Sequence, residues 1–224
     1  MPAKFRIKQY KAGGIYHIYN RGLDGRSVCD DETDFVTFEK LLRQYLTGTQ
    51  VEDDRYKSDK PSIVLRKQRM SLTGQIEMVA YCLMPDHIHL LVRQKTADAI
   101  TKLMRRVMTA YVMAYNLRHK RRGPLFEMAY RAVLVDTEEK ALHLTRWIHL
   151  NPVVRSVVRL GFMEGVTTTS PDAYLYSSYT HYIGKNVINW VNSYRGKMTQ
   201  NDYQNWVENP KIDSKAILGE LTID

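Results

Sequence analysis

The sequence predicts an α+β domain in which helices cover an antiparallel sheet. Strand-like and helix-like patterns alternate along the 224 residues in the order strand, helix, strand, strand, helix, strand, helix. The second and third strands are separated by only three residues, which suits neighbouring antiparallel strands. A composition of 44% hydrophobic and 25% charged residues is that of an ordinary globular protein, so we expect a packed core.

The first strand and the first helix have separate signals. Residues 15–21 (IYHIYNR) are rich in β-branched and aromatic side chains and follow two glycines, which predicts a strand. Residues 30–47 carry apolar side chains at helical spacing behind an acidic start, which predicts a helix that ends at Gly48.

A loop insertion and a strand pair come next. The segment 50–74 begins with a polar, charged stretch without periodicity and is predicted to be a loop insertion with local disorder. Two apolar, β-rich runs at 75–83 and 87–94 are predicted to be adjacent strands. Pro85 lies in the connection between them, where its lack of a donor is tolerated.

The second half of the domain is predicted as helix, strand, helix. Residues 97–119 form the most regular amphipathic pattern, and a basic, glycine-ended run terminates that helix. A strand is predicted at 125–135. The acidic residues after it start a helix that runs to Leu150 and stops at Asn151 and Pro152 or continues briefly beyond them.

The remaining sequence predicts a boundary near residue 160. Residues 1–160 are assigned to the domain, and residues 161–224 are expected to be a peripheral C-terminal extension without a second core. The extension carries a tyrosine-rich stretch that could stack on unpaired bases, although packing onto the domain is favoured. Its tyrosines are Tyr174, Tyr176, Tyr179 and Tyr182.

Basic residues are concentrated in two segments, the N-terminal stretch to Arg26 and residues 102–131. The chain has a formal net charge of +9 and a pI near 9.4, and residues 102–131 hold eight basic residues against one acidic residue. Such an excess indicates an anionic partner such as nucleic acid, although a single charge run is as often a solvated face. The candidate DNA-binding residues are Arg105, Arg106, Arg118, Lys120, Arg121, Arg122 and Arg131.

Several other classes of protein are not expected. Cys29 and Cys82 are far apart, which indicates reduced thiols in a cytoplasmic protein and excludes a cysteine-based zinc site. No apolar run is long enough to cross a bilayer, and secretion is not expected. The nucleotide-binding GxxxxGK[ST] and GxGxxG motifs and the hydrolase HExxH and GxSxG motifs are missing from the sequence.

A pair of histidines is the first chemical signal. His87 and His89 are two apart on a predicted strand, so their side chains lie on one face and can converge on a divalent cation. Two ligands are too few for a closed zinc site. On the last helix of the domain, His143, Trp147 and Asn151 follow at steps of four, which places them along one face.

Four blocks of sequence resemble the single-tyrosine HUH transposases, the group that includes the REP-associated tyrosine transposases. The blocks are GIYHIYNRG at 14–22, YCLMPDHIHLLV at 81–92, GPLF at 123–126 and RWIHLNPV at 146–153. They occur in order and span most of residues 13–160.

The resemblance implies a ferredoxin-like HUH domain that cleaves and rejoins DNA strands through a covalent phosphotyrosine intermediate. The implied partner is single-stranded or hairpin DNA, as befits DNA transposition and recombination. The implied cofactor is Mg²⁺ or Mn²⁺, with His87, His89 and Asn151 as ligands. Imidazole and amide ligands suit manganese better than an all-oxygen magnesium site. Family analogy also implies a homodimer, in which the helix bearing Trp147 can complete the partner's site.

The sequence departs from the family at the catalytic position. Trp147 stands where relatives carry the nucleophilic tyrosine, and an indole cannot form a phosphoester. Either another residue attacks, or the protein binds DNA without cleaving it, or it is a structural derivative with no DNA role. Binding without cleavage ranks slightly above attack by another residue. Tyr111, Tyr115 and Tyr130 are the substitutes considered, and the two on the long helix are more readily explained as core.

Three polar residues near the motifs receive structural interpretations. Asp86 is expected to form the turn and to point away from His87. His149 is expected to be structural or to support the site from behind. His143 is expected to face solvent or the sheet.

Overall fold

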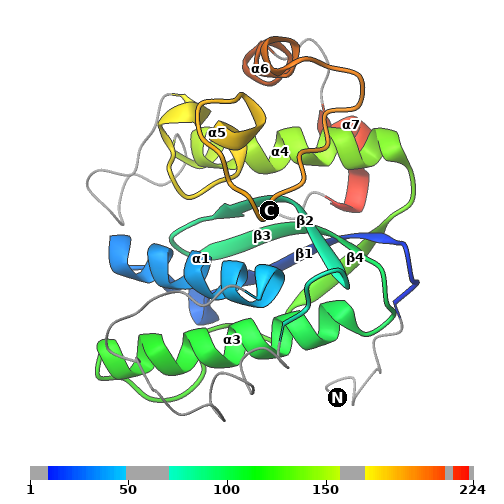
Figure 1. The fold of residues 1–224 in the computed structure, drawn as a ribbon. Coiled ribbons are helices and arrows are strands. Elements are labelled where there is room, and N and C mark those ends of the chain that lie inside the picture. Colours follow the sequence, from blue (N-terminus) through cyan, green and yellow to red (C-terminus); the bar gives the residue numbers. More distant parts are fainter. Residues whose placement is uncertain (1–9, 49–70, 157–169, 210–213, 222–224) are drawn as a thin grey trace.

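The computed structural model describes residues 10–48, 71–156, 170–209 and 214–221 (Figure 1). It confirms the α+β class, with a four-stranded sheet in the order β2-β3-β1-β4 and every neighbouring pair antiparallel. This order, with a helix after β1 and another after β3, is the ferredoxin-like arrangement. The strands are β1 (Ile15–Arg21), β2 (Ile76–Leu83), β3 (His87–Gln94) and β4 (Arg131–Val135).

The register of the sheet aligns the polar residues of three strands. Tyr19 on β1 lies opposite His89 on β3 and opposite Arg131 on β4, and Arg21 lies opposite His87. Because directly opposed residues of antiparallel strands share a face, these side chains form two rows on the same side of the sheet.

One face of the sheet is covered by α1 (Glu32–Thr47) and α3 (Ala99–Arg118) (Figure 1). The side chain of Asp31 caps α1 by accepting a hydrogen bond from the Asp34 backbone N–H, and Gly48 ends it with a φ of 68°. The apolar stripe predicted for the long helix is buried, which confirms its orientation. It consists of Ile100, Leu103, Met104, Val107, Met108, Tyr111 and Tyr115.

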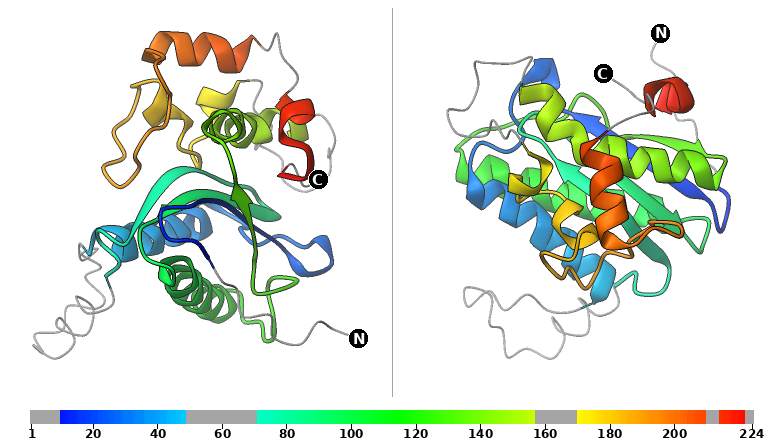
Figure 2. Two further views of the ribbon diagram at one scale, coloured as in Figure 1. Left: turned by 90° about the vertical axis from the view of Figure 1, so that its right-hand side faces the viewer. Right: turned by 90° about the horizontal axis from the view of Figure 1, so that it is seen from above.

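The opposite face of the sheet is covered by α4 (Glu138–Ser156) (Figure 2). The helix continues through Pro152 and so runs past the expected stop at Asn151. A proline inside a helix removes one backbone hydrogen bond. Asn151 and Pro152 are both buried, so tertiary packing outweighs this loss.

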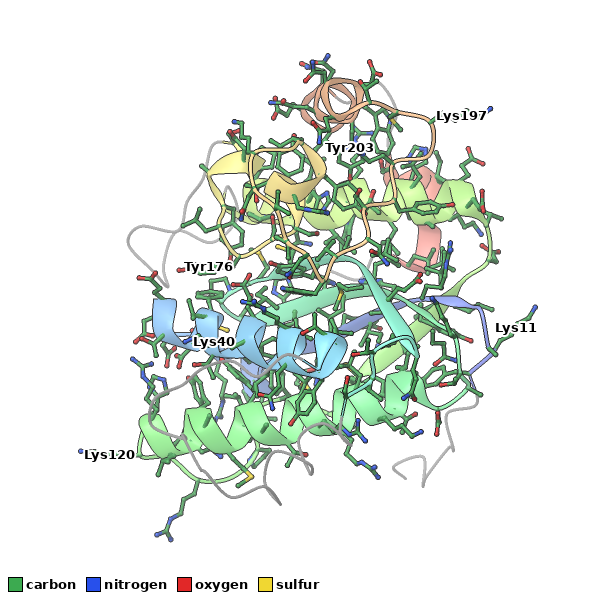
Figure 3. The ribbon with its side chains drawn as sticks, in the orientation of Figure 1. Lys11, Lys40, Lys120, Tyr176, Lys197 and Tyr203 are labelled. Carbon is green, nitrogen blue, oxygen red and sulfur yellow. The ribbon has the colours of Figure 1, made fainter. Side chains whose placement is uncertain are left out.

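The C-terminal residues pack against α4 and also reach the sheet, where Ser177 and Val191 bridge to β2 (Figures 1 and 2). Tyr179, Tyr182 and Tyr203 are fully buried, and the Tyr203 hydroxyl bonds to Thr145 and His149 of α4 (Figure 3). This confirms packing as the role of the tyrosine-rich stretch, but the extension is not peripheral, because its side chains belong to the main core. Its elements are η3 (Pro171–Ala173), α5 (Tyr179–Tyr182), α6 (Gln200–Glu208), α7 (Ser214–Leu218) and η4 (Gly219–Leu221).

Two further predictions concern the strand at 125–135 and the insertion at 50–74. The strand predicted at 125–135 is shorter, because residues 125–130 form a loop in which Phe126 pairs with Gly22. Most of the predicted insertion, residues 50–70, lies outside the described residues. Neither α3 nor α4, nor any shorter described helix, is apolar enough over a sufficient length to span a membrane.

Candidate metal and nucleic-acid site

His87 is oriented by the residue that precedes it. The ring is buried, and its Nδ1 lies 2.6 Å from Oδ1 of Asp86, whose other oxygen lies 3.6 Å from Arg21. A carboxylate accepts, so Nδ1 carries the proton and the Nε2 lone pair is directed away from Asp86. The expectation that Asp86 points away from His87 was wrong. Asp86 precedes the strand, and strand alternation does not apply to it.

His89 is oriented by a third histidine that the sequence interpretation missed. His17 on β1 is fully buried, and its Nε2 lies 3.0 Å from Nδ1 of His89. Its Nδ1 lies 3.0 Å from the carbonyl oxygen of Leu221, which can only accept. His17 therefore donates from Nδ1 and accepts the Nδ1 proton of His89 at Nε2. This arrangement leaves a lone pair on Nε2 of His89.

Burial keeps His17 neutral, as this chain of hydrogen bonds requires. Loss of solvation lowers the pKa of His17 to about 4, although the hydrogen bond to Leu221 opposes the shift. The sequence showed only that His17 lies two residues before Tyr19, on the same face of the predicted strand. Its partner could not be inferred without the register between β1 and β3.

Asn151 brings a third polar side chain to the histidine pair. Its Oδ1 lies 3.1 Å from Nε2 of His87, and both side chains are buried. Two ligands of one octahedral cation, each about 2.1 Å from the ion, lie about 3 Å apart. Two imidazole nitrogens and one amide oxygen are also a donor set suited to Mn²⁺. The residues present therefore fit the divalent cation that the motifs imply.

Trp147 lies directly over the histidines. Its half-buried ring packs edge-on against His89, with 4.8 Å between ring centroids, and against His17 at 5.8 Å. Trp147 and Asn151 are four residues apart on α4, so the helix presents both to the same face of the sheet. The position of the missing tyrosine is thus at the candidate site, but an indole occupies it.

The two histidines of α4, His143 and His149, lie away from this site. His143 is buried against Trp206 and 3.2 Å from Ser214, so the expectation that it faces solvent or the sheet was wrong. The C-terminal helices, which the sequence did not place, cover it. His149 is held between Tyr203 and Ser178, as a structural residue should be. Burial lowers its pKa to about 3.

The tyrosines considered as substitute nucleophiles do not reach this face. Tyr111 donates to the carbonyl of Val28, and Tyr115 donates to Asp30, both within the α1 and α3 layer. The Tyr130 hydroxyl accepts from Tyr10. All three are buried, which confirms the core interpretation of the helical pair.

The predicted DNA-binding residues divide between two layers. Arg131 is exposed on the edge strand and lies in the same row as His89. Arg105 and Arg106 belong to α3, on the other face of the sheet. Arg118 is engaged with Asp31 and Asp34. Three more basic residues follow the end of α3: Lys120, Arg121 and Arg122. The side chain of Lys120 extends from the body of the molecule (Figure 3).

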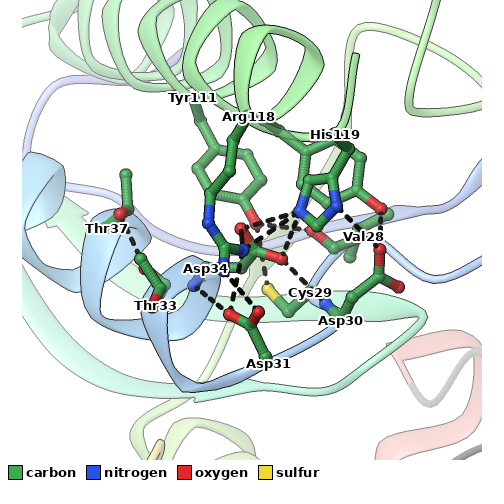
Figure 4. Close-up of polar contacts among 11 residues, drawn as sticks. Val28, Cys29, Asp30, Asp31, Thr33, Asp34, Thr37, Tyr111, Arg118 and His119 are labelled. Carbon is green, nitrogen blue, oxygen red and sulfur yellow. Dashed lines mark hydrogen bonds and ion pairs between the residues drawn. The ribbon is translucent and has the colours of Figure 1, made fainter. Parts of the chain in front are cut away.

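A second polar cluster fastens α1 to the end of α3 (Figure 4). Ligand-type atoms of Asp30, Asp34 and His119 lie within 4.8 Å of one another. Arg118 contacts Asp34 at 2.9 Å and also binds Asp31, and this hydrogen bond lowers the pKa of the Asp31 carboxyl. The carboxylates are thus already paired with a cation from the protein, so the cluster is explained as a clamp between helices.

Comparison with known proteins agrees with the fold and the motifs. Residues 41–151 match the family model described as "Transposase IS200 like", a range that includes the histidine pair, Trp147 and Asn151. This match places the chain among the IS200-like transposases, in agreement with the resemblance of its motifs.

A solved structure of a REP-associated tyrosine transposase bound to a REP hairpin has the same fold. It superposes with a TM-score of 0.52 at 14% sequence identity, covering 88% of this chain and 96% of the other. No curated protein matches the chain in sequence.

Proposed function

We propose that this protein binds a divalent cation through His87, His89 and Asn151, and that it cleaves and rejoins single-stranded or hairpin DNA. The convergence of Nε2 of His87 and Oδ1 of Asn151 carries the proposal, because two acceptors 3.1 Å apart need a cation or a proton between them. A bound Mg²⁺ or Mn²⁺ would polarise the scissile phosphate and stabilise the charge that develops on its oxygens. His17 and Asp86 hold the two rings in the tautomers that ligation requires.

DNA as the partner is supported by the family and by the rim of the site. The structurally similar transposase is bound to a REP hairpin. In the present chain, Arg21 and Arg131 flank the histidines on the same sheet face, where guanidinium groups can pair with phosphates. Family analogy also supports a homodimer, which light scattering of the purified protein tests.

A second candidate function is DNA binding without cleavage, and Trp147 is the observation that favours it. An indole N–H can donate a hydrogen bond to a phosphate but cannot attack phosphorus. In that case the ordered histidines would position a cation and DNA without forming a covalent intermediate.

One assay separates the two candidates. Labelled hairpin DNA with a single-stranded flank is incubated with the protein and Mn²⁺, and both free product and protein-DNA adduct are scored. Strand cleavage that is lost in His89→Ala and retained in the matched His143→Gln control supports the proposal. Binding without product supports the second candidate.

The salt dependence of binding tests the DNA partner itself. Each phosphate contact to a single strand should contribute about −0.7 to the slope of log K against log salt concentration. We expect a steep slope with hairpin DNA. A flat dependence, or no binding, would contradict both candidate functions and favour a structural derivative.

A further inference from the structure

The candidate site contains a tyrosine that is not on the helix. Tyr19 is half-buried on β1, on the same sheet face as His87 and His89. Its ring centroid is 5.4 Å from that of His17 and 6.4 Å from that of His89. Tyr19 thus brings a hydroxyl group next to both histidines.

The guanidinium group of Arg131 lies beside that hydroxyl. The register places Tyr19 between His89 on one neighbouring strand and Arg131 on the other. Arg131 Nη1 is 3.5 Å from the Tyr19 hydroxyl oxygen, and the guanidinium carbon is 5.9 Å from the ring centroid. A phosphate drawn to Arg131 would therefore be brought toward the phenolic oxygen. The same guanidinium would stabilise negative charge on that oxygen during attack.

We infer that Tyr19 takes the place of the tyrosine missing at position 147 and is the nucleophile of this protein. This inference rests on the proposed function, because it needs DNA at the face that carries His87 and His89. It differs from the family arrangement in where the nucleophile resides: on strand β1, opposite His89, instead of on α4. Trp147 then serves as packing over His17 and His89.

The chemistry balances without a further reactant. The phenolic oxygen of Tyr19 attacks phosphorus of a DNA phosphodiester, a bond forms between that oxygen and phosphorus, and the bond from phosphorus to the leaving deoxyribose oxygen breaks. The phenolic proton is released to solvent, and the leaving oxygen takes up a proton from solvent. The products are a tyrosyl phosphodiester and a free sugar hydroxyl. Attack by that hydroxyl, or by the hydroxyl of another strand end, reverses the step and rejoins DNA.

The strand-borne position has a physical advantage and a cost. The backbone of β1 is bonded on both sides, to β3 and β4, so Tyr19 is presented by a rigid element. A side chain fixed in the sheet cannot leave the site with its DNA end, as one on a separate helix can. We therefore expect cleavage and rejoining within one site.

The test is identification of the covalent adduct. Wild-type protein is incubated with Mn²⁺ and hairpin DNA in which the bridging leaving oxygen is replaced by sulfur, which slows rejoining. The adduct is digested and the modified residue is located by mass spectrometry. Tyr19→Phe is compared with Tyr176→Phe, which removes the hydroxyl of a half-buried tyrosine that stacks on Phe35 away from the site. DNA and Mn²⁺ binding are measured for each variant.

We expect the adduct on Tyr19, its loss in Tyr19→Phe with DNA and Mn²⁺ affinities within about twofold of wild type, and its retention in Tyr176→Phe. An adduct on a different residue, or cleaved DNA without an adduct, would overturn the inference and leave strand cleavage standing. Neither product nor adduct, with DNA and Mn²⁺ both bound, would overturn the inference together with strand cleavage.

Discussion

Two clusters of histidine and polar side chains lie on opposite faces of one sheet, and they are built on opposite principles. In the clamp between α1 and α3, Arg118 already pairs with Asp31 and Asp34, and His119 adds further hydrogen bonds (Figure 4). Under α4, the groups that converge are two imidazole nitrogens and an amide oxygen, with the protons directed outward. Histidines and carboxylates that lie near one another therefore do not by themselves define a metal site. A metal site also needs lone pairs that point toward one position.

The two clusters therefore respond to different losses. The clamp should matter for folding and not for cation binding, whereas the face under α4 should matter for cation binding and chemistry. Substitutions in each cluster test this difference.

Removal of a proposed ligand should have the largest effect. We expect His87→Ala to weaken Mn²⁺ binding by more than about 100-fold, since loss of a direct ligand should exceed the 10–100-fold typical of a supporting residue. Titration calorimetry measures the affinity. His143→Gln is the matched control, because His143 is a buried histidine with partners outside the site, and its affinity should equal that of wild type.

Removal of the residue behind a ligand should have an intermediate effect. His17→Phe deletes the acceptor that fixes the His89 tautomer, so Mn²⁺ affinity should fall by about 10- to 100-fold. His17→Gln retains an oxygen that can accept from His89 and should recover part of the loss. Equal affinities for wild type and His17→Phe, measured on folded protein, would show that His17 only fills the core.

Restoration of the family's residue should produce a gain. Position 147 lies over His89, so Trp147→Tyr should raise the initial rate of protein-DNA adduct formation by about tenfold or more, equivalent to about 1.4 kcal/mol of barrier. Denaturing gel electrophoresis at successive times after mixing with hairpin DNA and Mn²⁺ measures the rate. If the variant binds Mn²⁺ but forms no more adduct than wild type, the geometry around α4 no longer supports attack from the helix.

A change in the clamp should affect stability alone. Asp34 is buried and accepts from Arg118 and His119, so Asp34→Asn should lower the free energy of unfolding by about 1 to 2 kcal/mol. Urea unfolding measures this change, and Asp136→Asn, which alters an exposed residue that precedes α4 and pairs with Lys140, is the control with no measurable change. A loss of Mn²⁺ binding in Asp34→Asn would contradict the separation of the two clusters.

Local patterns were sufficient for the elements but not for their partners. β-rich composition predicted β1 and β3 closely, since both strands are buried over nearly their whole length, and helical periodicity predicted α3, whose apolar stripe faces the core. The contact between His87 and Asn151 agrees with the set of metal ligands that the family resemblance implied. His17 was missed because its role depends on a register between strands 72 residues apart. His143 was misplaced because α6 and α7, whose polar sequence gave no docking signal, cover that part of α4.

Tyr19 illustrates the same limit. The sequence places it in a strand beside His17, but its position between His89 and Arg131 results from three strands meeting in the order β3-β1-β4. Candidates chosen by residue type alone were the buried tyrosines of the opposite layer, whose hydroxyls are engaged with Val28 and Asp30.

Pulsed electron paramagnetic resonance of bound Mn²⁺ tests the central claim most directly, because it counts coordinated imidazoles. The face under α4 offers two, from His87 and His89, and the clamp offers one, from His119. We expect a spectrum with two imidazole nitrogens that falls to one in His89→Ala and is unchanged in Asp34→Asn. One imidazole in the wild type, with the signal lost in Asp34→Asn, would place the cation in the clamp and contradict the account.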